Sequence, residues 1–524
     1  MKNVDLNAID LDKAKELLAF AYQSLEKKDS EIKNQQDKIH DLQYKLIQAL
    51  KYRFAPKSEK QVDTTQQLSL LDTFDEPAVT TEQLAIREAD ASIYEPTKPR
   101  SVPKRKPLPQ ALPRVEVVQD IPVAEQVCTC GCALTYIGDE RSEKLEYIPA
   151  KVQVIVHVRK KYACKSCEDT IKTAPVAPAL LPKSIATPSL LSHIAVAKYD
   201  DHQPLYRQEE ILQRHGIDIA RNTLGDWMIR TGDAITPLIT LMRDDILSHD
   251  VALADETPLQ VLARPGKSAK AKSYMWLFIG GPPDKQAIIY HYGQSRDGDV
   301  PLRFLRGFSG YLHTDAYSGY LPLVATGKVN IVACLAHIRR KFFALTQTIK
   351  TEGLAHQAMA YITELYAIET QLREQNADIQ TIYATRQTHA KPIVDTMGAW
   401  LKANITKVPP KSPIGAAMQY ALNCWPNFSR YLDDGRLHID NNQSERAIKP
   451  FVIGRKNWMF CGNTRGAIAS ANLFSLIETA KAHGHNPYNY LNHVFTQLPL
   501  VKTTEQLQAL LPYHIDPEQL ATSP

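Results

Sequence analysis

Hydrophobic residues near the N-terminus recur every seven positions, which is the spacing of a coiled-coil seam. The residues at these positions are Leu11, Leu18, Leu25, Ile32, Ile39 and Leu46. A coiled coil also needs a second apolar residue three positions after each of these, and in the middle of the seam Lys28 and Gln35 stand there instead. We expect a dimerising coiled coil over residues 1–55, and the alternative is one long helix that packs against its own protein.

This periodicity fades after about residue 56. Residues 98–114 contain six basic residues, no acidic residue and several prolines, a composition typical of an extended, flexible chain. We therefore expect a flexible basic linker over residues 56–113. It either contacts DNA phosphates or is a solvated tether.

Helical patterns appear in the middle of the chain. Short helices are expected around Leu190–Ile194, 206–215 and 222–241, with a break near Gly216. Residues 183–247 therefore fit a helical DNA-binding region similar to a helix-turn-helix. Any other small helical bundle has the same pattern.

The region from residue 248 onward has the alternation of a β-sheet. Alternate residues from Val251 to Val261 form one strand, which places Asp255 in an otherwise mostly apolar row. A fourth strand in this region ends at Asp315. After the first strand we expect two strands over residues 274–279 and 287–292 and a helix over 300–305. Two further strands are expected over residues 310–314 and 329–335.

A long helical stretch follows and lasts until about Tyr431. Residues 440–446 then begin another helix, on which Asn441, Glu445 and Ile448 share one face. This order of elements is that of the ribonuclease H-like (RNase H-like) fold. We expect a multidomain α/β protein. Its RNase H-like catalytic domain would cover residues 248–465 and contain a helical insertion over about 337–437, and a C-terminal helical region would follow over residues 466–516.

Three carboxylates in this order of elements could meet. In that fold an acid in the first strand, an acid at the end of the adjacent fourth strand and an acid on the last helix converge, and these are Asp255, Asp315 and Glu445. Carboxylates grouped in this way bind two Mg²⁺ or Mn²⁺ ions for phosphodiester chemistry. Glu256 and Asp440 are near enough in sequence to compete as ligands. The alternative is that these acids are ordinary surface residues.

Basic residues follow the fifth strand and the last acid. A cationic cluster beside carboxylates could hold DNA phosphates, and the alternative is a solvated helix surface. The candidates are His337, Arg339, Arg340, Lys341, Arg446, Arg455 and Lys456. We expect Cys334, Cys424 and Cys461, which have no metal-like spacing, to be buried thiols.

The other five cysteines, at positions 128, 130, 132, 164 and 167, cluster within 40 residues. Cys164 and Cys167 have the spacing of a zinc knuckle, and a second pair would complete a structural Zn²⁺ site. That pair is drawn from Cys128, Cys130 and Cys132; a glycine after Cys130 favours the first two. We expect a zinc-binding module over residues 114–182, with a half-buried strand at 151–159. The alternative is a module that folds without metal.

Composition sets looser limits. The 524 residues are 44% hydrophobic and 23% charged, as in soluble proteins of several domains, and the net charge of +5 permits a nucleic-acid partner without requiring one. The N-terminus has acidic residues where a signal peptide has basic ones, and no apolar run is long enough to span a membrane. We therefore expect a cytoplasmic protein with reduced thiols and no membrane contact.

Several motifs resemble the insertion-sequence-66 family of transposases. They lie along nearly the whole chain, in the family's order, at residues 53–60, 199–207, 255–258, 315–320, 334–342, 440–446, 454–457 and 475–481. Two departures are Leu335, where the family often has Trp, and Cys128-Thr-Cys130 in place of a Cys-x-x-Cys pair. The second departure leaves the zinc ligands open.

The resemblance implies a bacterial, nucleoid-associated DDE transposase whose catalytic acids are Asp255, Asp315 and Glu445. Such an enzyme would bind the terminal inverted repeats of its own element, cut double-stranded DNA and join it to target DNA. It would act as a homodimer or higher oligomer, with small accessory proteins of the same element as further partners. The alternatives are a zinc-containing DNA-binding regulator with an inactive nuclease-like core, and an RNase H-like nuclease.

Overall fold

The computed structural model describes residues 28, 152–163, 171–315, 317–347 and 352–521. The described residues fall into two compact units, one before Pro175 and one that contains residues 175–521. The predicted coiled coil (apart from Lys28), the predicted basic linker and the five clustered cysteines lie outside the described residues.

In the smaller unit, the described residues form a short antiparallel hairpin of β1 (Lys161–Ala163) and β2 (Ile171–Thr173). The half-buried strand predicted over 151–159 is wrong for the part that is described. Residues 152–160 form no strand, and the side chains of Val154, Val156 and Val158 are exposed. Alternation predicts a strand only where another strand pairs with it, and the hairpin begins after the valines.

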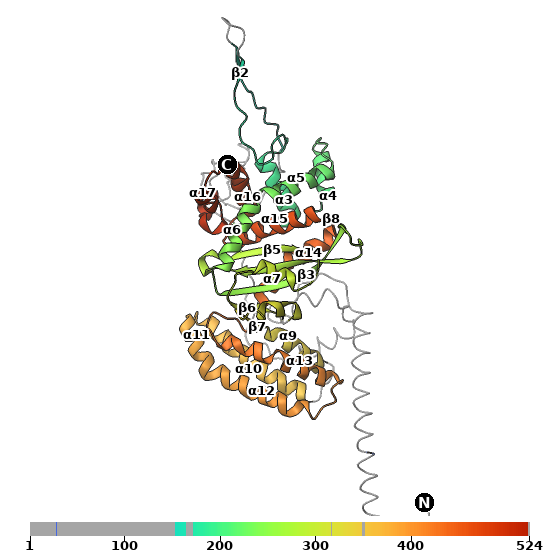
Figure 1. The fold of residues 1–524 in the computed structure, drawn as a ribbon, viewed down its shortest axis with the longest axis vertical. Helices are drawn as coiled ribbons and strands as arrows, with labels where there is room; N and C mark the ends of the chain where they lie inside the picture. The colour runs from blue at the N-terminus through green and yellow to red at the C-terminus, as the bar shows by residue number, and fades with distance from the viewer. Residues whose placement is uncertain (1–27, 29–151, 164–170, 316, 348–351, 522–524) are drawn as a thin grey trace, which may run out of the picture. The chain divides into compact units, whose positions relative to one another are not determined.

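A mixed sheet is the centre of the larger unit (Figure 1). Its strands lie in the order β5-β4-β3-β6-β7, antiparallel among the first three and parallel among the last three. Their bounds are β3 (Val251–Ala263), β4 (Lys272–Gly280), β5 (Ala287–Gly293), β6 (Gly310–Thr314) and β7 (Val329–Ala333). The order of elements agrees with the sequence prediction, except that β7 ends two residues earlier. A further short strand, β8 (Cys461–Asn463), pairs with the far end of β3.

Helices that precede the sheet in the sequence and helices that follow it share one hydrophobic core with β3, β4 and β5. They are α3 (Pro188–Tyr199), α4 (Leu205–Arg214), α5 (Arg221–Ala234), α6 (Thr236–Leu247), α7 (Asp299–Phe304), α14 (Asn442–Trp458), α15 (Thr464–Ala482), α16 (Pro487–Gln497), α17 (Thr504–Gln508) and α18 (Pro517–Ala521), with α8 (Leu321–Val324) between β6 and β7. The helix predicted over 222–241 is two helices that meet at Ile235. The region expected to bind DNA, 183–247, therefore packs against the sheet.

Helix α15 closes the edge of the sheet. It is buried on every side from Ala469 to Ala480, as expected of a helix without a polar face. The Ser475 and Thr479 hydroxyls accept hydrogen bonds from the backbone N–H groups of Tyr290 and Ile288 on β5, over 2.8 and 3.0 Å. These side chains satisfy backbone groups that an edge strand would otherwise leave unpaired.

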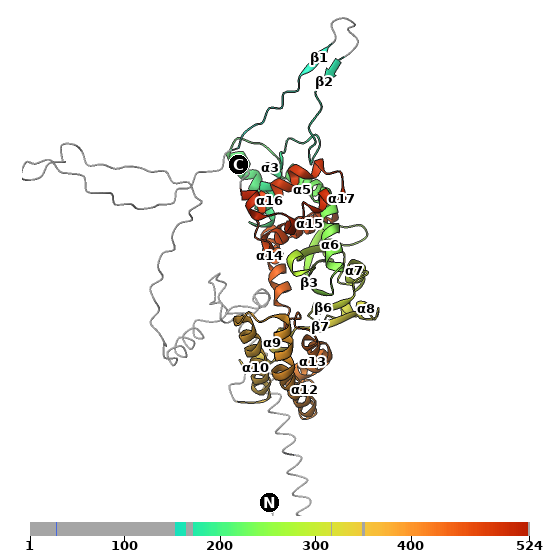
Figure 2. The same cartoon turned by 90° about the vertical axis from the view of Figure 1, so that its left-hand side faces the viewer.

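The helical insertion has a core of its own. It consists of α9 (Leu335–Thr346), α10 (Leu354–Glu374), α11 (Ile379–Thr385), a π-helical turn (Arg386–Ala390), α12 (Lys391–Ile405) and α13 (Pro413–Phe428). Figures 1 and 2 show these helices together beside β6 and β7, at the opposite end of the sheet from α15. Leu312 of β6 belongs to the first core, whereas Val332 and Ala333 of β7 belong to the core of the insertion. The β6–β7 side of the sheet therefore lies between the two cores.

Candidate active site

The register of the sheet places two of the predicted acids side by side. In the parallel pair β3 and β6, Leu253 lies opposite His313. Asp255 and Asp315 each follow two residues later, just beyond the last paired residues of the two strands, and the Asp315 charge acts on the Asp255 carboxyl. The Asp255 and Asp315 carboxylates accept the backbone N–H groups of Glu256 and Tyr317, over 2.8 and 2.9 Å.

The third acid comes from α14. Asn441 precedes this helix, and its side-chain amide donates to the Ala254 carbonyl on β3 over 3.1 Å. Glu445 follows one turn later, and its N–H donates to the Asn441 carbonyl. Asn441, Glu445 and Ile448 are all buried, so the face predicted for this helix is the one that packs on the sheet. The bond to Ala254 thus brings Glu445 to the strand that carries Asp255.

The acids interact electrostatically. Burial raises the pKa of Asp255 well above its ordinary value, and the negative charges of Glu256, Asp315 and Glu445 raise it further. Like charges that repel each other in a partly buried site are stabilised by cations. The oxygen donors of Asp255, Asp315 and Glu445 are those that hard divalent cations prefer, so this donor set fits Mg²⁺ or Mn²⁺.

Glu256 pairs with an arginine that no sequence motif indicated. Arg296, in the loop after β5, donates from Nε to Glu256 Oε1 over 2.8 Å, and Tyr320 donates to Glu256 Oε2 over 2.7 Å. An Arg296 terminal nitrogen also lies 3.8 Å from Asp315 Oδ2, and the guanidinium stacks on the Tyr317 ring. Glu256 therefore already has two strong partners. Tyr317 and Tyr320 belong to the motif at 315–320, but Arg296 lies in a loop without a pattern.

Asp440, the other possible competitor, also has partners. Its Oδ2 accepts from Tyr366 of α10 over 3.1 Å and from the Asn442 side chain over 2.7 Å. Its Oδ1 accepts the Asn442 N–H at the start of α14. Asp440 therefore joins the insertion to the beginning of this helix.

The first basic cluster divides into two parts. His337 Nδ1 and an Arg340 terminal nitrogen lie 3.8 and 3.9 Å from Glu445 Oε1. Burial, followed by the Arg340 charge, lowers the pKa of His337 to about 4, so its imidazole is neutral at pH 7. Arg339 and Lys341 instead lie over the rings of Phe343 and Tyr420 in the insertion.

The second basic cluster lies along α14. Arg455 donates to the Thr257 hydroxyl over 3.0 Å and to the Pro258 carbonyl, two and three residues beyond Asp255 on β3. The side chains of Arg446 and Lys456 are exposed. Arg455 is thus the member of this cluster whose position near the acids is fixed by hydrogen bonds to β3.

The three cysteines expected to be buried thiols are free and buried. For Cys334, which has no metal-like spacing to the other cysteines, the fold adds two neighbours of another kind. Its Sγ, a His337 ring nitrogen and a Glu445 carboxylate oxygen lie within 4.8 Å of one another. The pattern Cys334-x-x-His337 at the start of α9 was the signal in the sequence, and Glu445 joins it only in the folded chain.

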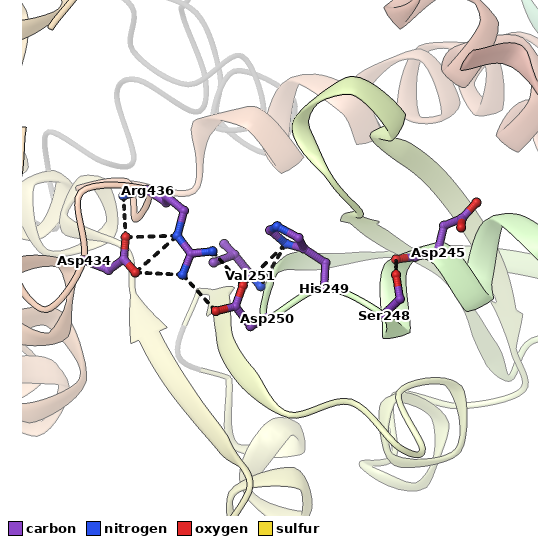
Figure 3. Close-up of polar contacts among 7 residues, drawn as sticks. All are labelled: Asp245, Ser248, His249, Asp250, Val251, Asp434 and Arg436. Carbon is purple, nitrogen blue, oxygen red and sulfur yellow. Dashed lines mark hydrogen bonds and ion pairs between the residues drawn. The ribbon is translucent and has the colours of Figure 1, made fainter. Parts of the chain in front are cut away.

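Two arginines hold the segment that precedes α14. Figure 3 shows Arg436 between Asp434 and Asp250, which immediately precedes β3. Its terminal nitrogens lie 2.7 and 2.8 Å from the two Asp250 oxygens and 2.8 Å from Asp434 Oδ2. Arg386, buried in the π-helical turn, donates to the carbonyls of Tyr431, Asp434 and Leu437 and pairs with Glu369 over 2.8 Å.

No helix within the described ranges combines the length and the apolar character needed to cross a membrane.

Family profiles match four parts of the chain. The profile described as "Transposase IS66 family" matches residues 183–469, and "IS66 C-terminal element" matches 475–513. The profile "zinc-finger binding domain of transposase IS66" matches 125–168, which contains all five clustered cysteines. "Transposase C of IS166 homeodomain" matches 41–117, across the end of the predicted coiled coil and the predicted linker.

Three proteins of Sinorhizobium fredii (strain NBRC 101917 / NGR234) are similar over most of their length. Uncharacterized protein y4qI is 32% identical over 80% of this chain and 79% of its own. Uncharacterized protein y4jD is 33% identical over 79% of this chain and 82% of its own. Uncharacterized protein y4hP is 32% identical over 83% of this chain and 81% of its own. The first family profile covers more than half of the 524 residues and includes Asp255, Asp315 and Glu445. The family predicted from the motifs is confirmed: this chain belongs to the IS66 family of transposases.

Proposed function

We propose that the mixed sheet and α14 form an RNase H-like catalytic core, in which Asp255, Asp315 and Glu445 hold two Mg²⁺ or Mn²⁺ ions. The observation that carries this proposal is the convergence of three carboxylates from β3, the end of β6 and α14. It rests on the Leu253–His313 register and the hydrogen bond from Asn441 to Ala254. When bound, the ions would activate an attacking hydroxyl and stabilise the leaving oxygen.

The chain's own residues would bind and orient the DNA. His337 and Arg340 lie at Glu445, and Arg455 is held against β3 near Asp255. We propose that they contact the phosphates at the cleaved bond, while Arg339, Lys341, Arg446 and Lys456 contact flanking phosphates. Glu256 binds the Arg296 guanidinium, which lies 3.8 Å from Asp315, and would act as a positioning residue that limits its interaction with Asp315.

We also propose the reaction and the partners of the whole protein. It would bind the terminal inverted repeats of its element, cleave a strand with water and join the freed 3′-hydroxyl to target DNA. Two ends require at least a dimer, for which the heptads of residues 1–55 are a candidate. Cys164, Cys167 and two of Cys128, Cys130 and Cys132 would hold a structural Zn²⁺. Small accessory proteins of the element would be further partners.

A strand-transfer assay with a pre-cut element end and Mg²⁺ tests this function. We expect the wild type to join DNA and Glu445→Gln to bind DNA but join it at least about 1,000-fold more slowly. Glu478→Gln is the matched control, because Glu445 and Glu478 each have 8% of their surface exposed. Glu478 lies on α15, where it pairs with Lys481 over 3.0 Å.

The same assay separates the alternatives. Cleavage without joining would favour an RNase H-like nuclease. Metal-independent DNA binding without either reaction, also after the element's other gene products are added, would favour a DNA-binding regulator.

A further inference from the structure

A thiol, an imidazole and a carboxylate meet where α9 begins. Cys334 is the residue before this helix, His337 lies in its first turn and Glu445 faces them from α14. One potential ligand atom from each lies within 4.8 Å of the other two. Bonds of about 2.0–2.3 Å to a tetrahedral ion would place ligand atoms roughly 3.3–3.8 Å apart. Side-chain shifts of about 1 Å would therefore complete such a site.

Two contacts at these atoms favour a bound metal ion, which would compete with Arg340, 3.9 Å from Glu445 Oε1. His337 Nδ1 is buried without a hydrogen-bond partner among the described residues, and the Glu445 carboxylate lies 3.8 Å away. Cys334 Sγ accepts the backbone N–H of Asn441 over 3.1 Å. A donor to the sulfur is the kind of outer contact that orients a thiolate ligand and stabilises its charge.

We propose that Cys334, His337 and Glu445 form a binding site for a thiophilic divalent ion such as Zn²⁺. Sulfur and imidazole ligands select Zn²⁺ over Mg²⁺, which prefers oxygen. On binding, the thiol releases its proton to solvent and the sulfur bonds to the ion. The site differs from the cysteine-rich segment 128–167 and shares only Glu445 with the proposed catalytic acids.

This site would regulate the enzyme, an extension that rests on the proposed function. An ion held by Cys334 and His337 would take Glu445 away from Asp255 and Asp315. Zn²⁺ would therefore inhibit joining in the presence of Mg²⁺, while the binding itself would need neither DNA nor catalysis.

Cobalt absorbance tests the binding directly, because a thiolate bound to Co²⁺ gives a charge-transfer band in the near ultraviolet. The full-length protein is first loaded with one Zn²⁺ and then titrated with Co²⁺. We expect a thiolate band that Cys334→Ser removes and a Co²⁺ affinity that His337→Ala weakens by roughly tenfold or more. Cys461→Ser, which changes another buried thiol, and Asp255→Asn should retain the band.

Equal bands in the wild type and Cys334→Ser would overturn the proposal. Melting temperatures without added metal identify a variant that fails to fold, and the half-buried His337 provides a second substitution if Cys334→Ser is unstable. In the strand-transfer assay, the Zn²⁺ concentration for half inhibition should rise about tenfold in Cys334→Ser, relative to its own zinc-free rate. A cobalt band in a protein that never joins DNA would refute the proposed function and leave the metal site standing.

Discussion

The side-chain amide of Asn441 donates a hydrogen bond to the backbone carbonyl of Ala254 over 3.1 Å. The two residues are 187 positions apart in the chain. Asn441 is the residue before α14, and Ala254 is the neighbour of Asp255 on β3. This single bond therefore fixes the helix of one proposed catalytic acid to the strand of another.

Removal of this bond should impair joining more than stability. We expect Asn441→Ala to lower strand transfer about 10- to 100-fold and the free energy of unfolding by about 1–3 kcal/mol, since the Ala254 carbonyl loses its side-chain donor. Asn472→Ala is the matched control, because the buried Asn472 amide donates to the Gly232 carbonyl over 2.9 Å. The control should lose similar stability and keep its rate. Equal losses of rate in both variants would contradict the positioning role of Asn441.

Glu256→Gln should change the metal requirement. Without the negative charge of Glu256, Arg296 interacts more strongly with Asp315, from which it lies 3.8 Å. We expect the Mg²⁺ concentration for half-maximal joining to rise several-fold and the rate at saturating Mg²⁺ to stay within about tenfold of the wild type. A Mg²⁺ titration of both proteins measures this. If Glu256→Gln joins as poorly as Glu445→Gln at every Mg²⁺ concentration, Glu256 is itself a ligand.

The insertion should contribute to the position of α14 through Arg386. Arg386→Met leaves Glu369, whose side chain is 10% exposed, without its partner, and we expect a loss of about 3 kcal/mol in the free energy of unfolding. The double change Arg386→Met with Glu369→Leu should recover part of that loss, because it removes the unpaired carboxylate but leaves the carbonyls of residues 431, 434 and 437 without their donor. Arg465→Met removes an exposed pair with Asp233 and should cost less than about 1 kcal/mol. Denaturant unfolding measures all three, and a double variant as unstable as Arg386→Met would be evidence against this account.

The contribution of Arg436 should depend on pH. Hydrogen bonds from Arg436 lower the pKa of both Asp250 and Asp434. Their stabilisation is therefore complete above the unfolded value of about 3.9 and is lost as the pH falls through the lower folded values. Because the Asp250 side chain is 51% exposed, we expect less than about 1 kcal/mol from its pair with Arg436.

The difference in unfolding free energy between the wild type and Arg436→Met measures this contribution. It should be constant from pH 7 to about 5 and shrink below about pH 4. A difference that grows at low pH would show that the two aspartates are not the source of the stabilisation.

The elements that local patterns define were predictable. Alternation gave β3 with Asp255 inside it, and i, i+4 spacing gave the buried face of Asn441 and Glu445. Contacts between distant segments were not. Arg296 lies in a loop without periodicity, and its role depends on the position of β5 beside β3 and β6. For the alternating valines of residues 152–158 a strand was predicted that the structure does not contain, because alternation alone cannot provide a neighbouring strand.

The proposed metal ligands and the insertion show the same limit. Cys334 and His337 are close in sequence, but Glu445 comes from beyond the whole insertion. Nothing in the spacing of Arg386 indicates that its guanidinium would bind carbonyls at positions 431–437. Sequence motifs thus pointed to the candidate acids, and only the fold explains what holds them in place.

The metal preference of Asp315→Cys tests most directly whether these acids hold catalytic ions. Mn²⁺ accepts a sulfur ligand more readily than Mg²⁺ does. We expect Asp315→Cys to join a pre-cut element end at least about 1,000-fold more slowly than the wild type in Mg²⁺ and to recover roughly 100-fold in Mn²⁺. Asp315→Ala should stay inactive in both metals. If the Cys and Ala variants have the same residual rate in Mn²⁺ as in Mg²⁺, Asp315 is not a metal ligand and the proposed centre is wrong.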